Sequence, residues 1–186
     1  GAPESFKISG VRISGGDLRG LMYGLLEAAE QIRSTGRLAP ASGSAASPVR
    51  GVRFAVQVRH LEEGWFHSRD YWEELAAMLA RSRLNRLNLV FEQSVIFTGR
   101  LHQTLRLLSD IASAYGVDLA ISLRPESLGP GGGELKALLS GAPAVRSVQV
   151  AGSSAGRLDL IRAIGEAGRM VTAEVPHADL TPPILK

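Results

Sequence analysis

The chain has 186 residues, of which 45% are apolar, and this is enough to form the core of one domain with a small additional unit. Its formal net charge is +3, but the basic residues are scattered among acidic ones, whereas a nucleic-acid-binding surface needs them clustered on one face. The apolar runs are too short to cross a bilayer, and the absence of cysteine excludes disulfides and thiolate chemistry. We therefore expect a protein that binds neither nucleic acid nor membrane.

The first residues predict a small β-β-α unit. Residues 5–14 alternate weakly around a glycine, which is typical of a short hairpin. Asp17 is placed to cap a helix over about 18–34, which carries leucines and an isoleucine on one broad face. Gly20 and Gly24 share a side of this helix, where they would let it approach a sheet closely.

The boundaries of this unit follow from composition. Residues 1–35 hold the β-β-α pattern, and residues 36–50 contain Gly, Ser, Ala and Pro without periodicity, which indicates a linker. The chain begins with Gly-Ala-Pro and not with Met, and shows no signal peptide. We expect it to be an excised or processed portion of a longer protein, from the cytoplasm or exported.

From residue 51 to 186, helical and strand patterns alternate regularly. Strands are expected over 52–58, 87–92, 117–123, 145–150 and 170–175. Helices are expected over 68–83, 101–115, about 133–140 and 156–167. The apolar run around Leu87, Leu89 and Phe91 predicts a strand buried on both faces. Such alternation predicts an α/β fold with a parallel sheet.

Two α/β architectures fit this pattern. One is a partial (β/α) barrel of about five parallel strands in sequential order, and the other is a flavodoxin-like doubly wound sheet with the first strand inside the order. The preceding β-β-α unit and linker favour the barrel. An open piece of barrel would leave two unpaired sheet edges and, we expect, apolar side chains on its inner face. A homo-oligomer formed through the open edges is therefore expected.

Two segments carry a resemblance to a known group of enzymes. GGDLRGLMYGLLEAAEQIR resembles the end of the small α/β domain that precedes the barrel in glycoside hydrolases such as the family 20 β-hexosaminidases and the α-glucuronidase-like enzymes. YWEELAAMLARSRLNRLNLVF resembles the first helix and second strand of their barrel. The matching residues are Arg19, Gly20, Tyr23, Gly24 and Leu25 in the first segment, and Trp72, Leu79, Ala80, Asn85 and Leu87 in the second. The resemblance implies a carbohydrate-active, glycoside-hydrolase-like protein without a cofactor, of which this chain is an N-terminal portion.

Ligands of parallel α/β proteins bind at the carboxyl ends of the strands, and several polar residues follow those ends here. Glycoside hydrolysis uses a pair of carboxyl groups, so Glu126 and Glu174 are the candidate catalytic residues. Glu174 lies in an apolar strand, where a structural ion pair is the alternative role. Candidate substrate-binding residues are Arg59, His60, Glu62, Trp65, Arg124 and His177. His177 and Asp179 lack a third ligand at metal spacing, so no metal site is expected.

These binding candidates also have structural alternatives. The segment around His60 and Glu62 is typical of a solvated loop, and Trp65 could equally cover the mouth of the barrel. The enzymes that the chain resembles usually carry their acid at the end of the fourth barrel strand. The sequence here is AGSSAG, with no carboxylate. We therefore expect a protein that binds carbohydrate but does not hydrolyse it. The alternative is a non-catalytic, flavodoxin-like domain that binds a small ligand or a protein partner.

Overall fold

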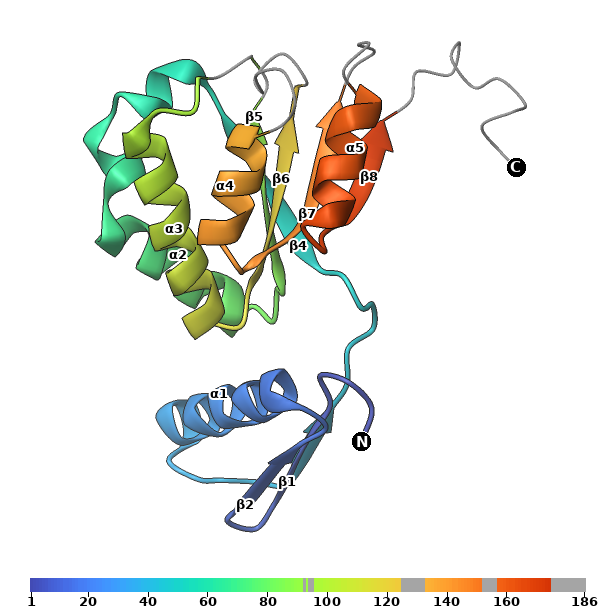
Figure 1. The fold of residues 1–186 in the computed structure, drawn as a ribbon. Coiled ribbons are helices and arrows are strands. Elements are labelled where there is room, and N and C mark those ends of the chain that lie inside the picture. Colours follow the sequence, from blue (N-terminus) through green and yellow to red (C-terminus); the bar gives the residue numbers. More distant parts are fainter. Residues whose placement is uncertain (92, 94–95, 125–132, 152–156, 175–186) are drawn as a thin grey trace, which may run out of the picture.

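The computed structural model describes residues 1–91, 93, 96–124, 133–151 and 157–174, and shows a small three-stranded unit next to a larger five-stranded one (Figure 1). The small unit contains β1 (Phe6–Ser9), β2 (Arg12–Gly15), α1 (Leu18–Thr35) and β3 (Ala41–Gly43). Both β2 and β3 pair antiparallel with β1, so the predicted hairpin is confirmed. The segment 36–50, which we expected to be a linker, includes β3 and therefore contributes a strand to the small sheet.

Glycine determines how α1 meets this sheet. The Asp17 carboxylate accepts a hydrogen bond from the backbone N–H of Gly20 at 2.7 Å, which caps the helix as expected. A Cβ atom on Gly20 would lie 2.2 Å from the carbonyl oxygen of Ser5, and one on Gly24 would lie 2.8 Å from the Ile13 side chain. The packing role expected for the two glycines is therefore confirmed.

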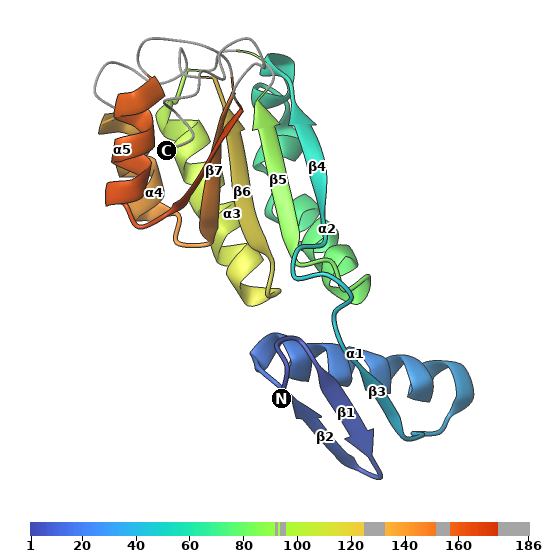
Figure 2. The ribbon, with the colours of Figure 1, turned by 90° about the vertical axis from the view of Figure 1, so that its right-hand side faces the viewer.

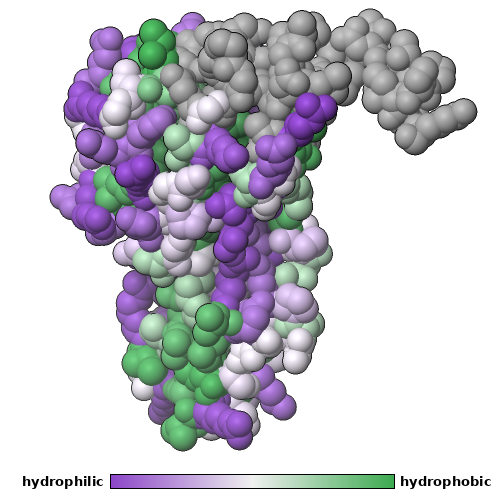
Figure 3. Space-filling view, viewed as in Figure 1, coloured by the Kyte–Doolittle hydropathy of each residue, from purple (hydrophilic) through white to green (hydrophobic). Residues whose placement is uncertain are grey.

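Only part of the broad apolar face of α1 packs on the sheet, where Met22 and Leu26 contact the small core. The buried residues of the helix are Gly20, Tyr23, Gly24 and Ala28. By contrast, Leu18 is 87% exposed, Leu25 53% and Ile32 54%. Residues seven apart lie on one side of a helix, so these three form an apolar stripe on the surface. Figure 3 shows apolar surface over this part of the small unit.

The larger unit alternates strands with helices, as predicted. In chain order it contains β4 (Gly51–Val56), η1 (Val58–Leu61), η2 (Gly64–His67), α2 (Arg69–Arg81), β5 (Arg86–Phe91), α3 (Gly99–Ala114), β6 (Asp118–Leu123), α4 (Gly133–Gly141), β7 (Val145–Ala151), α5 (Arg157–Glu166) and β8 (Met170–Glu174). All neighbouring strands are parallel and the order is β4-β5-β6-β7-β8. This confirms the sequential arrangement, and the doubly wound alternative is wrong. The described strands form no closed barrel, because β4 and β8 are both edges of the sheet.

The helices α2 to α5 lie on one face of the sheet (Figures 1 and 2). Leu87, Leu89 and Phe91 of β5 point into the core beneath them, whereas the alternate residues Asn88 and Val90 are only half-buried. The expectation that this strand is buried on both faces is therefore wrong, because helices cover a single face. We call the uncovered side the open face.

The open face is mainly polar, not apolar as we expected. The alternation along each strand places on it Arg53, Arg86, Asn88, Ser122 and Gln149. Polar side chains can face water without the penalty of exposed apolar surface, so this part of the sheet is compatible with solvent. None of the helices that the structure describes is long and apolar enough to cross a membrane.

Candidate functional site

The carboxyl end of β4 leads into two short turns that carry four of the predicted binding residues. Arg59 and His60 lie in η1, Glu62 ends it, and Trp65 lies in η2. Arg59 and Glu62 are exposed, whereas His60 and Trp65 are half-buried. The structure therefore places these four residues in two consecutive turns at the edge of the sheet where we expected a ligand.

Trp65 is part of an aromatic cluster. Its ring centroid lies 4.9 Å from that of Tyr71, 6.1 Å from that of Phe54 and 6.4 Å from that of Trp72. Phe54 and Trp72 contribute to the core between the sheet and the helices. Much of the Trp65 ring is thus engaged in packing on the helix side of the sheet, and only part of it is accessible to a ligand.

His60 has a defined orientation in the same turn. Its Nδ1 accepts a hydrogen bond from the backbone N–H of Gln57 at 3.2 Å. Its ring meets that of Trp65 edge to face, with centroids 5.4 Å apart. In the neutral ring the proton is therefore on Nε2, which is the nitrogen left to donate to a ligand oxygen.

A histidine that the sequence did not single out holds this turn in place. His67 Nε2 lies 2.8 Å from the carbonyl oxygen of Leu61, and Nδ1 lies 2.5 Å from Oγ1 of Thr104 on α3. The Thr104 hydroxyl also reaches the carbonyl oxygen of Arg100 at 3.0 Å. These bonds connect η1 and η2 to α3. No motif in the sequence signals them, because Thr104 is 37 residues away.

The other candidates are placed only in part. Arg124 is exposed and directly follows β6, at the same end of the sheet as the turn after β4. Glu174 is the last residue of β8 and pairs with Ala151 in the register, and only its backbone is described. Glu126, His177 and residues 152–156, the part of AGSSAG that follows β7, lie outside the described residues. The relative positions of Glu126 and Glu174 as a catalytic pair thus stay a prediction.

Comparisons with known proteins agree with this arrangement at the level of the fold. No family model matches the sequence, and no curated protein matches it. A solved structure described as a "GH138 enzyme targeting pectin rhamnogalacturonan II" aligns over 90% of this chain with a TM-score of 0.68 and 14% identity. A second, described as "Structure of CpGH84B", aligns over 89% with a TM-score of 0.59 and 14% identity. Both structural neighbours are glycoside hydrolases.

The match covers only a portion of those enzymes. The chain spans 28% of the length of the GH138 structure and 34% of the GH84 structure. At this identity the likeness concerns the fold alone. It supports a glycoside-hydrolase-like α/β fold that includes the small unit, since nine tenths of the chain take part.

The opposite end of the sheet contains a polar junction between the two units. The Glu4 carboxylate is buried and accepts hydrogen bonds from Arg19 and Asn85 at 2.8 Å each and from Arg50 at 2.5 Å. Arg19 also forms an ion pair with Asp118 at the start of β6, at 3.1 Å. Glu4 thus joins the small unit to the beginning of β4 and to the residue preceding β5.

Hydrogen bonds and neighbouring charges keep the Glu4 carboxylate of this junction ionised. Burial by itself raises the pKa of the Glu4 carboxyl, but hydrogen bonds from Asn85, Arg19 and Arg50 outweigh it and the pKa is lowered from its ordinary value of 4.5. Burial, followed by the negative charge of Glu4, raises the pKa of the Tyr23 hydroxyl. Glu4 is therefore ionised and Tyr23 neutral at neutral pH.

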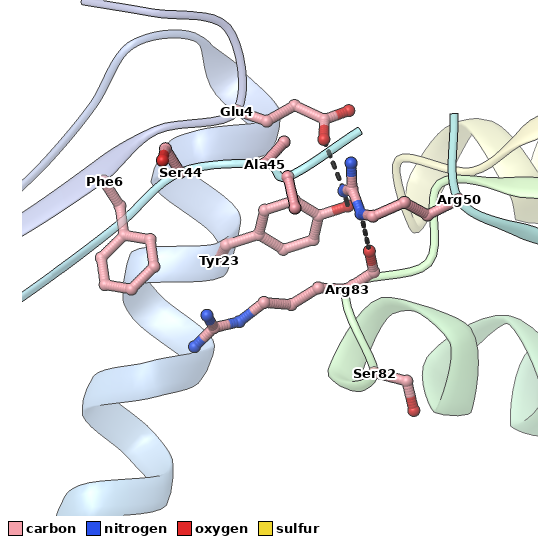
Figure 4. A pocket seen from close by; sticks show the side chains of 9 residues that line it. Glu4, Phe6, Tyr23, Ser44, Ala45, Arg50, Ser82 and Arg83 are labelled. Carbon is pink, nitrogen blue, oxygen red and sulfur yellow. Dashed lines mark hydrogen bonds and ion pairs between the residues drawn. The ribbon is translucent and has the colours of Figure 1, made fainter. Parts of the chain in front are cut away.

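A cleft of about 210 Å³ borders the junction. Figure 4 shows Glu4, Tyr23 and Arg50 meeting at its edge, while the Arg83 side chain extends toward α1. Its charged groups are already satisfied, because Arg83 pairs with Glu27 and Arg50 with Glu4. Residues at the amino ends of barrel strands usually contribute to stability, and residues at the carboxyl ends bind ligands. We therefore assign the cleft a structural role and keep the carboxyl-end edge as the candidate site.

Proposed function

We propose that this chain is a carbohydrate-binding portion of a glycoside-hydrolase-type protein, with the small unit and the first five strands of its barrel. Residues 1–35, together with β3 from the segment 36–50, would then be the remnant of the small α/β domain that precedes such barrels, and residues 51–186 the partial barrel. The observation that carries the proposal is the sequential parallel sheet preceded by a small α/β unit, which aligns with a GH138 enzyme over 90% of this chain.

The sugar would bind at the carboxyl ends of the strands. Arg59 and Glu62 are exposed there and can donate to and accept from hydroxyl groups, while His60 presents Nε2. Arg124 adds a second cation after β6, and the accessible part of the Trp65 ring adds an apolar contact. His177 completes the proposed set.

A comparison of two arginine substitutions tests this site. Arg59→Gln removes a proposed contact, and Arg12→Gln removes an arginine that is also exposed, on β2 of the small unit. Losing one charge-assisted hydrogen bond is expected to raise the Kd for a bound oligosaccharide about tenfold in the first variant only. Calorimetric titration across a panel of plant and bacterial oligosaccharides measures this. If no member of the panel binds, the proposed function is wrong.

We further propose that the chain does not hydrolyse glycosides at an enzymatic rate. The usual mechanisms need two carboxyl groups on either side of the sugar, and each positioned acid or base contributes on the order of 10²–10⁴-fold. The segment after β7 contains only Gly, Ser and Ala, whose side chains cannot supply a proton near neutral pH. Five strands also surround a sugar on one side only, so its orientation is poorly fixed.

Release of nitrophenol from nitrophenyl hexosaminides, glucuronides and galacturonides checks this prediction. We expect no turnover above the uncatalysed rate for the chain, or for its Glu126→Gln and Glu174→Gln variants. Turnover that disappears in either variant would show that this carboxylate replaces the missing acid, and the prediction of inactivity would then be wrong.

A further inference from the structure

Two arginines lie side by side on the open face. In the parallel register Arg86 is opposite Gly51, and Arg53, two residues along β4, is opposite Asn88. A Cβ atom on Gly51 would lie 2.8 Å from the Cβ of Arg86, so the glycine leaves room for the Arg86 side chain to cross the face. Arg53 and Arg86 are thus diagonal neighbours, a distance at which long side chains interact.

Neither guanidinium has an ion-pair partner among the residues that the structure describes. Asp118, the acidic residue of this face on β4 to β7, lies opposite Arg86 in the register of β5 and β6. Its carboxylate pairs with Arg19 at 3.1 Å and is approached by Arg146 at 3.8 Å, and forms no ion pair with Arg86. Long side chains of diagonal neighbours reach each other, so the two positive charges of Arg53 and Arg86 repel. An anion placed between Arg53 and Arg86 would remove that repulsion.

The polar residues next to the arginines are oriented by one hydroxyl group. Ser122 Oγ lies 3.2 Å from Oδ1 of Asn88 and 2.9 Å from Oε1 of Gln149, on the two adjoining strands. A hydroxyl group has a single proton, so Ser122 donates to one of these two amide oxygens, and the NH₂ group of that amide is left to face outward. Guanidinium and amide NH₂ groups are donors only. This part of the open face therefore suits a ligand rich in acceptor oxygens.

The kinds of side chain on the open face favour one class of such ligands over the others. Of the side chains described on it, none is aromatic, whereas single-stranded nucleic acid is usually held by bases stacked on aromatic rings. Trp65, the expected platform for a neutral sugar, packs on the other side of the sheet. Charge is therefore the main source of affinity on this face, and planar guanidinium groups match carboxylates.

We propose that the open face of β4 to β7 binds an acidic oligosaccharide, with Arg53 and Arg86 holding uronate carboxylates and the amides of Asn88 and Gln149 forming hydrogen bonds with the neighbouring hydroxyls. This inference rests on the proposed carbohydrate-binding function and names its substrate class. It concerns a surface separate from the edge that carries Arg59 and His60.

The test compares two double variants by calorimetric titration with trigalacturonate, with a neutral galactose trisaccharide and with triglutamate. Arg53→Gln/Arg86→Gln removes the proposed contacts. Arg12→Gln/Arg37→Gln makes the same change in net charge at exposed positions of the small unit. We expect the unaltered chain to bind trigalacturonate at least tenfold more tightly than either other ligand. We also expect the first double variant to lose at least tenfold in affinity and the second to lose less than twofold.

Each alternative outcome has one meaning. Equal binding of the neutral and acidic trisaccharides that survives Arg53→Gln/Arg86→Gln would overturn this inference and leave the proposed function intact. Equal binding of triglutamate and trigalacturonate would show a general anion site and would also overturn it. Absence of binding to both trisaccharides would overturn the inference together with its basis.

Discussion

Glu4 is the residue on which the connection between the two units depends. Its buried carboxylate accepts hydrogen bonds from Arg19, Arg50 and Asn85, which belong to the small unit, to the segment before β4 and to the residue before β5. Removing one partner from a buried charged cluster leaves the other groups without compensation. The energetic effect of a substitution there should therefore exceed that of a surface ion pair such as Arg69–Glu73.

We predict that Glu4→Gln lowers the free energy of unfolding by about 2 kcal/mol at pH 7, because charge-assisted hydrogen bonds to two arginines are weakened. The control is Glu73→Gln, which breaks an exposed pair and should change it by less than about 0.5 kcal/mol. Urea titration of both variants measures the difference. Equal effects of the two substitutions would contradict the assigned role.

The effect of Glu4→Gln should also depend on pH. The pKa of Glu4 is lowered on folding, so its contribution is fully present above the unfolded-state value of about 4.5 and is lost as pH falls through the lower, folded-state value. Protonated Glu resembles Gln, so the stability difference between the two proteins should shrink steadily below about pH 4.5. A difference that is constant from pH 7 to pH 3 would show that charge is not the cause.

His67 is the second residue whose role can be isolated. We predict that His67→Phe destabilises the fold by about 1–3 kcal/mol, because the Leu61 carbonyl and the Thr104 hydroxyl both lose a partner in a partly buried region. A double-mutant cycle with Thr104→Val separates the bond from general packing, and the two losses should be less than additive. Fully additive losses would mean that the two side chains do not interact.

Sequence reasoning identified some of these residues but not their relationships. Asn85 emerged from the resemblance, whereas its partners Glu4 and Pro48 are 81 and 37 residues away and no local pattern indicates them. The four candidates from Arg59 to Trp65, in η1 and η2, were found because they follow a predicted strand. The packing of Trp65 on Phe54 and Tyr71 depends on tertiary structure and could not be read from that position.

At the level of elements, two helical glycines differ in their packing. Gly20 faces the backbone of β1 so closely that a Cβ atom would overlap the Ser5 carbonyl oxygen, whereas a Cβ atom on Gly165 in α5 would meet nothing within 4 Å. Alanine is a better helix former than glycine by about 1 kcal/mol. Alanine substitutions at Gly20 and Gly165 therefore distinguish the effect of helix propensity from that of close packing.

We predict that Gly20→Ala lowers the free energy of unfolding by about 1–3 kcal/mol, because α1 must move away from the sheet. Gly165→Ala should raise it by up to about 1 kcal/mol, because propensity acts there alone. Thermal and urea unfolding followed by circular dichroism measure both. If Gly20→Ala were also stabilising, the close approach of α1 to β1 would not hold in solution.

Helices and strands with a strong periodic pattern were predicted correctly. A strand that is specified only by its pairing with another strand was missed. The helix expected over 68–83 is α2, which starts at its Ser68 cap. The strand Ala41–Gly43 was missed because three small residues carry no alternation, and its pairing with β1 specifies it. For β5, a run of apolar residues suggested two buried faces, although Arg86 and Asn88 already marked one side as polar.

On the scale of the molecule, the regular alternation of strands and helices was sufficient to predict a parallel sheet with sequential order, which the structure confirms. The open face was predicted to be apolar by analogy with barrel interiors. It is mainly polar, and Arg53, Arg86 and Gln149 already indicated this in the sequence. The same finding removes one route to self-association and leaves two others, the edges at β4 and β8 and the apolar stripe of α1.

We predict that the chain forms a dimer or larger species at micromolar concentration, mainly through the α1 stripe. Leu18, Leu25 and Ile32 recur every seven residues and are more than half exposed, so two antiparallel copies of α1 can pair along one apolar seam. Leu25→Glu places a charge at the middle of that seam and should shift the protein to monomer in sedimentation velocity.

Val11→Glu, at the tip of the β1–β2 hairpin and 97% exposed, is the control and should leave association unchanged. A dimer that survives Leu25→Glu would assign association to the strand edges, which unpaired backbone groups make the next strongest route. A monodisperse monomer of the unaltered chain would exclude both.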